Sequence, residues 1–91
     1  MNTVTIIDLH GNITTCEPTF KAVKAALDGA FVTPIRLKDG SILLVDEDGT
    51  LKDLPSNTAA SVLLAGTQFE GDVLVGKVAH VPKQLVRTVI G

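Results

Sequence analysis

Three carboxylates stand close together in the middle of the chain, at Asp46, Asp48 and Asp53, with Gly49 among them. Carboxylate oxygens suit Ca²⁺, and a calcium loop places them at alternate positions around a central glycine and closes with a glutamate. Here Gly49 is out of register with Asp46, and the closing glutamate is missing. We therefore favour a β-turn, in which aspartate side chains accept hydrogen bonds from nearby backbone N–H groups, over a metal site.

The chain has a single cysteine, Cys16, and two histidines, His10 and His80. A thiol and an imidazole far apart in sequence can meet in a fold and form a nucleophilic pair. Neither histidine has a cysteine, histidine or carboxylate neighbour at metal-ligand spacing. An unreactive thiol at the surface or half buried is the favoured interpretation of Cys16.

The serines and glycines carry no catalytic motif. Ser41, Ser56 and Ser61 all lie outside a G-x-S-x-G pattern, which exposes an activated hydroxyl. Neither G-x-G-x-x-G nor G-x-x-x-x-G-K-[ST], the glycine-rich patterns that hold phosphates, occurs. We expect a protein that is not an enzyme and that uses no cofactor.

Asn57 follows Leu54-Pro55 and is the first polar residue of an expected helix. Backbone N–H groups at a helix start can hold an anion, and the charge of Lys52 is close in sequence. An ordinary N-cap, in which the Asn57 side chain accepts from a helix N–H, is the favoured alternative. In the ligand hypothesis Asn57 and Thr58 donate to a phosphate or carboxylate.

Two further acids complete the predicted ligand-binding set. Asp72 either accepts backbone N–H bonds at the start of the last strand or lines the same pocket as Asn57. Glu47 is a ligand contact or, in a weaker hypothesis, a carboxylate of a divergent hydrolase, as Asp72 also is. The predicted ligand-binding residues are therefore Asn57, Thr58, Lys52, Asp72 and Glu47.

The hydrophobic pattern predicts alternating strands and helices. Strands are expected at residues 3–9, 13–15, 31–37, 41–45, 50–52 and 71–79, and helices at 18–27, 58–65 and, as a short turn, 82–90. This order favours an α+β fold, with a mixed or mostly antiparallel sheet and two to three short helices packed on one face.

The helix at residues 18–27 has the clearest pattern. Pro18 suits a first helical position, and Gly29 suits the position just past the end. Phe20, Val23 and Leu27 share one apolar stripe.

The strands carry their own signals. Ile6-Ile7 indicates burial on both faces of an interior strand, and the aliphatic run 42–45 indicates a central one. Asp39-Gly40 predicts a hairpin turn with positive φ at both residues. Pro34 cannot donate to a ladder, which predicts a free edge or a bulge there.

Length and composition fit one small domain over residues 1–91. The chain has no Trp or Tyr, and its net charge is −2. Aromatic stacking platforms and a basic excess, which nucleic-acid binders need, are therefore missing. A small ligand or a protein partner fits better, and no nucleic acid is expected.

A lone cysteine favours a reducing compartment, and the sequence shows neither a signal peptide nor an apolar run that spans a bilayer. We expect a cytoplasmic protein with no membrane partner. The apolar segment 81–90 either covers the core or forms a contact in a homodimer or higher homo-oligomer.

Residues 38–49 lead into Leu54-Pro55-x-Asn57, and Asp72-Val73-x-x-Gly76 follows. Over residues 3–77 these motifs resemble the small family known as domain of unknown function 3846, whose members occur mostly on phages, plasmids and related mobile elements. The asparagine of that family is often followed by an arginine, and Thr58 stands there instead.

The resemblance implies a phage or mobile-element protein, acting in the cytoplasm of a host cell. We expect a non-catalytic binding protein that counteracts host defence, either by sequestering a small nucleotide-type signal or by blocking a host protein. The alternative is an accessory subunit that binds a partner protein through an exposed strand edge.

Overall fold

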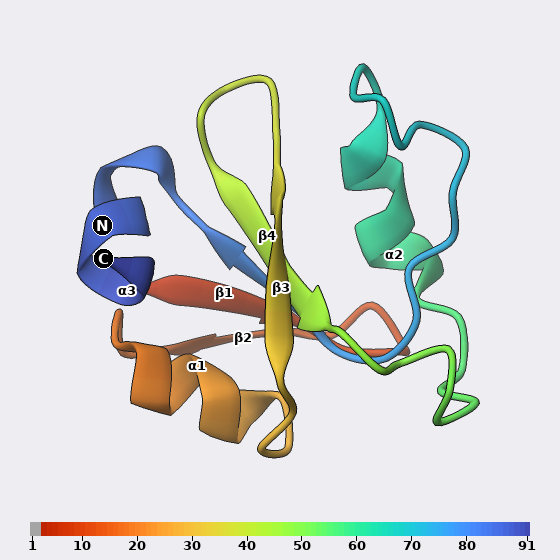
Figure 1. The fold of residues 1–91 in the computed structure, drawn as a ribbon, viewed down its shortest axis with the longest axis horizontal. Coiled ribbons are helices and arrows are strands. Elements are labelled where there is room, and N and C mark those ends of the chain that lie inside the picture. Colours follow the sequence, from red (N-terminus) through yellow and green to blue (C-terminus); the bar gives the residue numbers. More distant parts are fainter. Residues whose placement is uncertain (1–2) are drawn as a thin grey trace.

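The computed structural model describes residues 3–91. Its strands are β1 (Val4–Ile7), β2 (Ile13–Cys16), β3 (Val32–Arg36), β4 (Ile42–Asp46) and β5 (Val78–Val81). They form one antiparallel sheet in the order β2-β1-β5-β4-β3, in which two hairpins flank the last strand (Figure 1). The predicted α+β fold with a mostly antiparallel sheet is confirmed.

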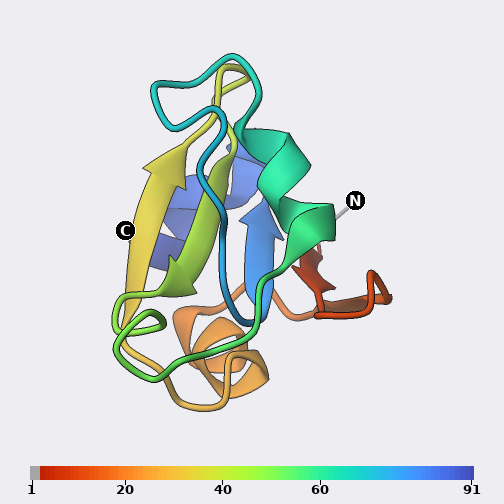
Figure 2. The same cartoon turned by 90° about the vertical axis from the view of Figure 1, so that its right-hand side faces the viewer.

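The helices are α1 (Phe20–Ala26), α2 (Thr58–Ser61) with its continuation η1 (Val62–Leu64), and η2 (Lys83–Leu85) with its continuation α3 (Val86–Ile90). α1 and α3 pack on one face of the sheet, and α2 with η1 packs on the other (Figures 1 and 2). The expectation that all helices share one face is wrong. No helix within residues 3–91 is long and apolar enough to cross a membrane.

The two covered faces follow from the aliphatic strands. Leu43 (0% exposed) belongs to the α2 side of the core, and its neighbour Leu44 (1% exposed) belongs to the α1 side. Successive side chains of a strand point to opposite faces, so a strand that is aliphatic throughout needs cover on both. Ile6 and Ile7 in β1 are divided in the same way, which confirms the predicted burial.

β3 is an edge strand, as Pro34 predicted. The Leu37 amide donates to the Ser41 carbonyl at 2.9 Å, and the Glu47 amide donates to the Phe31 carbonyl at 2.8 Å. Hydrogen-bonded positions alternate in an antiparallel ladder, so the backbone groups of Val32, Pro34 and Arg36 face outward. The missing N–H of Pro34 therefore falls where no partner strand lies.

Two details of the predicted helix 18–27 are wrong. The helix starts after Thr19, whose Oγ1 accepts from the Ala22 amide at 3.1 Å, so Pro18 precedes the cap. Phe20 is 46% exposed because it occupies the first position of a short helix, while Val23 and Leu27 are buried. Gly29 lies past the helix end, as predicted; it has φ +77°, and Asp28 before it also has a positive φ, of +60°.

The turns and the last strand differ further from expectation. Only Gly40, not Asp39, has positive φ in the β3–β4 hairpin, because a three-residue loop needs the left-handed conformation only at its last position. Residues 50–52 form a turn instead of a strand. The last strand starts at Val78, not at residue 71, and before it only Val75 forms a bridge, to Ser56. The helical turn expected within 82–90 is confirmed.

Candidate functional site

Asn57 is completely buried and is a junction of the fold. Its Nδ2 donates to the carbonyl oxygens of Ile7 at 3.0 Å and Gly76 at 2.8 Å. Its Oδ1 accepts from the Ala60 amide at 3.0 Å, and its backbone N–H donates to the Leu74 carbonyl at 2.7 Å. The side chain thus joins the start of α2 to the end of β1 and to the loop that precedes β5.

These bonds confirm the N-cap interpretation of Asn57 and exclude its side chain from ligand contact. Both amide hydrogens are donated within the protein, and the residue has no exposed surface. The sequence signal for the cap was present, but its two distant carbonyl partners come from tertiary packing.

Thr58 and Asp72, also predicted as ligand residues, do line one groove. The groove lies beside α2 and has a volume of about 360 Å³; it is lined by Thr58, Ser61, Val62, Ala65, Glu70, Gly71 and Asp72. Its charged residues are the two acids, which would repel a phosphate or carboxylate. The groove beside α2 is therefore unsuited to binding an anion.

Lys52 and Glu47 lie elsewhere. Lys52 forms an ion pair with Asp46, with Nζ and Oδ2 2.9 Å apart, and lines a different cavity of about 220 Å³ near Lys77. Glu47 is exposed just after β4. The five predicted ligand residues thus occupy separate places: one is buried, two share the α2 groove, and two lie near the end of β4.

The aspartates after β4 form a turn, as favoured above. Asp46 Oδ1 accepts from the Asp48 amide at 2.8 Å. The hydrogen bond from Lys52 Nζ, together with that amide, holds the pKa of Asp46 below its ordinary value. No group of three His, Cys, Asp or Glu side chains suited to a metal ion occurs among residues 3–91.

A polar chain that the sequence analysis missed runs from Asp39 through Ser41 to His80. The Ser41 hydroxyl and amide both donate to Asp39 Oδ1, the amide at 2.9 Å, and His80 Nε2 lies 3.0 Å from Ser41 Oγ. These hydrogen bonds from Ser41 lower the pKa of Asp39. The spacing of Asp39 and Ser41 is typical of an Asx turn, whereas the contact with His80 requires the sheet.

The three side chains Asp39, Ser41 and His80 do not have the geometry of a nucleophilic triad. In a triad the imidazole lies between the acid and the hydroxyl, whereas here Ser41 lies between Asp39 and His80. Ser41 is also only 2% exposed, so its oxygen cannot meet a substrate. Its effect is to fasten the β3–β4 turn to β5.

Cys16 is half buried at the end of β2 and packs against the α1 side of the core. Burial, and to a smaller degree the Glu17 carboxylate, raises the pKa of the thiol. A raised pKa lowers the thiolate fraction at neutral pH. The favoured interpretation, an unreactive half-buried thiol, agrees with this position.

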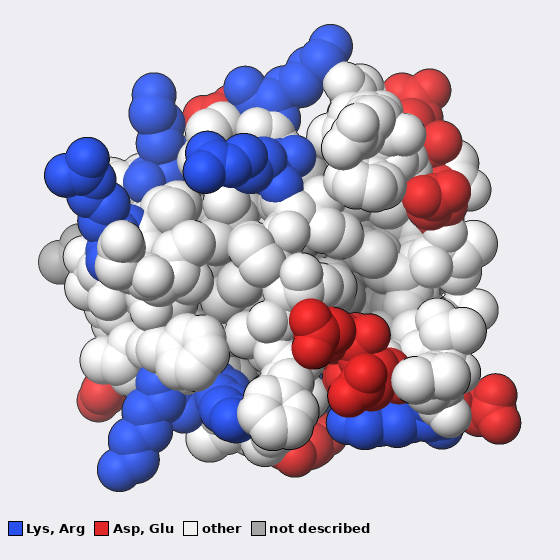
Figure 3. Space-filling view, in the orientation of Figure 1, with Lys and Arg blue, Asp and Glu red and all other residues white. Residues whose placement is uncertain are grey.

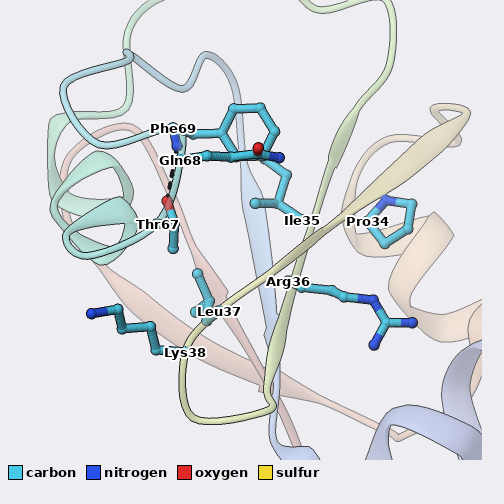
Figure 4. A pocket seen from close by; sticks show the side chains of 8 residues that line it. All are labelled: Pro34, Ile35, Arg36, Leu37, Lys38, Thr67, Gln68 and Phe69. Carbon is cyan, nitrogen blue, oxygen red and sulfur yellow. Dashed lines mark hydrogen bonds between the residues drawn. The ribbon is translucent and has the colours of Figure 1, made fainter.

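A larger cavity, of about 570 Å³, opens beside β3 (Figure 4). We call it the β3 groove; it lies between the edge strand and the loop 66–70 and is lined by Pro34, Ile35, Arg36, Leu37, Lys38, Thr67, Gln68 and Phe69. The apolar side chains of Ile35 and Leu37 are half buried against the α2 side of the core. Phe69 remains 37% exposed across from them.

The loop wall of the β3 groove is braced by its own hydrogen bonds. Thr67 Oγ1 donates to the Leu64 carbonyl at 2.7 Å. The same oxygen accepts from the Phe69 amide at 3.1 Å (Figure 4). The Glu70 carboxylate accepts from the Gly66 amide. These bonds hold the wall in place without a ligand.

Basic side chains lie near this part of the molecule and elsewhere on the same face. Figure 3 shows basic side chains over the tip of the β3–β4 hairpin, on the α3 side and along the lower edge of the visible face, while acids lie mainly along the α2 side and in the lower part. The stem of Lys38 lies against Gly66, where an added Cβ would be 3.1 Å from Lys38 Cδ. The ion pairs within residues 3–91 are Lys52–Asp46 and Lys77–Asp28, so Arg36 and Lys38 pair with no carboxylate there.

Comparisons with known proteins do not assign a function to the chain, so a function has to be argued from the geometry of the site. No family model, no curated protein and no solved structure matches the chain. The resemblance to domain of unknown function 3846 therefore stays a prediction.

Proposed function

We propose that this chain is a non-catalytic binding protein that holds an extended, acidic segment of a partner protein in the β3 groove. The observation that carries the proposal is Lys38, a cation without an acidic partner within residues 3–91 whose stem lies against Gly66 at the rim of a groove with an apolar floor. Arg36, which also has no acidic partner there, lines the groove from β3, but its side chain extends away from the loop wall (Figure 4). Such cations attract carboxylates, and apolar floor residues accept the side chains between them.

The shape of the site supports an extended segment. The groove follows an edge strand whose outward backbone groups at Val32 and Arg36 are free to pair, as in strand addition. Pro34 interrupts this edge and removes one donor. Binding there consequently depends on side chains that fit the groove, which makes it selective.

The remaining polar groups support a role without catalysis. Ser41 has the hydroxyl closest to a triad arrangement, and it is buried with its hydrogen committed to Asp39. The thiol of Cys16 has a raised pKa. Neither group combines exposure with activation, which a nucleophile requires.

A small nucleotide-type ligand is the second candidate occupant of the same groove. The half-exposed ring of Phe69 offers a stacking surface, and Lys38 offers charge for a phosphate. In a phage or mobile-element setting, which the resemblance implies, the first occupant would mean blocking a host protein and the second sequestering a signal. An accessory subunit would use the same strand edge.

The test is an NMR titration of the isotope-labelled protein. The probes are a blocked peptide of alternating glutamate and valine, the matching lysine and valine peptide, and a cyclic dinucleotide. We expect the glutamate peptide to shift the amides of Arg36, Lys38 and Phe69, because these residues line the groove. Equal shifts with the lysine peptide, or shifts confined to other surfaces, contradict the proposal. Shifts with the dinucleotide alone select the second candidate.

A further inference from the structure

The outer edge of β2 is a second open edge of the sheet. The Asp8 amide donates to the Asn12 carbonyl at 3.0 Å, and the register pairs Ile6 with Thr14 and Val4 with Cys16. Because hydrogen-bonded positions alternate, the N–H and C=O groups of Ile13 and Thr15 point away from β1. They form an outward row of two donors and two acceptors.

This edge lacks the protection that β3 has. Proteins commonly blunt exposed edges with proline or charge, and β3 carries Pro34 and Arg36. β2 reads Ile-Thr-Thr-Cys, with neither device. Ile13 is also 67% exposed, although it is a large apolar residue.

The edge of β2 is complementary to itself. In an antiparallel pair centred on Thr14, Ile13 of one copy faces Thr15 of the other, and the same contact repeats on the other side of the two-fold axis. All four outward groups of each edge then find partners. The nearest flanking charge, Glu17, comes opposite Gly11 of the second copy, so the ladder sets no like charges side by side.

We infer that the edge of β2 binds a second copy of this chain and joins the two sheets into one continuous antiparallel sheet. The interface rests on a different strand from the β3 groove, and it does not depend on the proposed function. Because β2 and β3 are the opposite ends of the strand order, the dimer keeps both β3 grooves open. It would therefore present two grooves to a partner.

The experiment is sedimentation equilibrium of the purified protein under reducing conditions, which prevent disulfide formation through Cys16. The variant Ile13→Lys places a charge in the edge, and Val62→Lys is its matched control, because Val62 is also 67% exposed but lies in η1. We expect the wild type and Val62→Lys to dimerise with a dissociation constant on the order of 100 µM, as befits a small interface. Ile13→Lys should remain monomeric.

A monomeric wild type at about tenfold above that concentration, or equal dissociation of the two variants, overturns the inference. Amide hydrogen exchange gives a second test that needs no variant. The N–H groups of Ile13 and Thr15 should gain protection as the protein concentration rises. If they exchange freely at every concentration, the edge is not the interface.

Discussion

Asn57 Nδ2 lies 2.8 Å from the carbonyl oxygen of Gly76, and this hydrogen bond fastens the start of α2 to the loop before β5. The same nitrogen binds the carbonyl oxygen of Ile7 in β1. Asn57, for which the sequence left both an N-cap and a ligand site open, is thus part of the scaffold that holds α2 on the sheet.

Replacing Asn57 by alanine should lower the free energy of unfolding by about 3 kcal/mol, because it removes three buried hydrogen bonds, to the carbonyls of Ile7 and Gly76 and from the amide of Ala60. Urea denaturation followed by circular dichroism measures the change. Ser56→Ala, at an exposed neighbouring position, is the control and should change stability by less than about 0.5 kcal/mol. Similar losses for both variants would contradict the role assigned to Asn57.

Gly76→Ala should destabilise the fold by about 1–2 kcal/mol, because an L residue is strained at φ +76°. An added Cβ would also lie 2.8 Å from Leu54 Cδ1. Gly29→Ala is a matched control, since Gly29 has φ +77° and no atom within 4 Å of the added Cβ. Thermal unfolding of both variants separates the backbone strain from the crowding. A smaller loss for Gly76→Ala than for Gly29→Ala would show that Leu54 does not restrict this position.

The Lys52–Asp46 pair should make the fold sensitive to acid. The hydrogen bond from Lys52 lowers the pKa of folded Asp46 below the ordinary 3.8, so the folded state binds fewer protons than the unfolded chain. This stabilisation is present above about pH 4 and is lost as the pH falls through the lower folded pKa. Lys52→Ala should raise the pKa of Asp46 toward 3.8, as measured by NMR titration of its carboxyl carbon. An unchanged titration curve would show that the Asp48 amide alone sets this pKa.

Ser41→Ala should raise the pKa of Asp39, because the Ser41 hydroxyl is the main cause of its lowered value. The carboxyl carbon titration of Asp39 reports the shift, and the ring resonances of His80 should change as Nε2 loses its partner. Ser61→Ala keeps the chemical change but lies outside this polar chain, and it should leave both signals in place. If Ser41→Ala left the Asp39 titration unaltered, the hydroxyl would not hold that carboxylate.

The strands could be predicted from the sequence where a local sequence feature determines their burial or their place in the sheet. The aliphatic run of β4 requires burial on both faces, and Pro34 fits only where no ladder bond is needed. The side of the sheet that each helix covers was not predictable, because it depends on how β1 and β4 divide their side chains between two cores. The extent of β5 also depends on pairing with β1 and β4, which residues 71–77 mostly lack.

The candidate site was predictable to a smaller extent. Thr58 and Asp72 were expected to share a pocket with Asn57; they do line one groove beside α2, but Asn57 is buried and is not part of it. The β3 groove brings residues 34–38 close to residues 67–69. A contact between segments so far apart in the sequence cannot be predicted from a local sequence pattern. The link from Ser41 to His80 was missed for the same reason.

The most direct test of the account is the affinity of the glutamate and valine peptide for the wild type and two charge-reversal variants. Lys38→Glu changes the rim of the β3 groove, and Lys21→Glu makes the same change on the exposed side of α1. We predict that Lys38→Glu weakens binding by at least about tenfold at low salt, and that Lys21→Glu has little effect. Equal affinities for all three proteins, or equal losses in both variants, would contradict the β3 groove as the binding site.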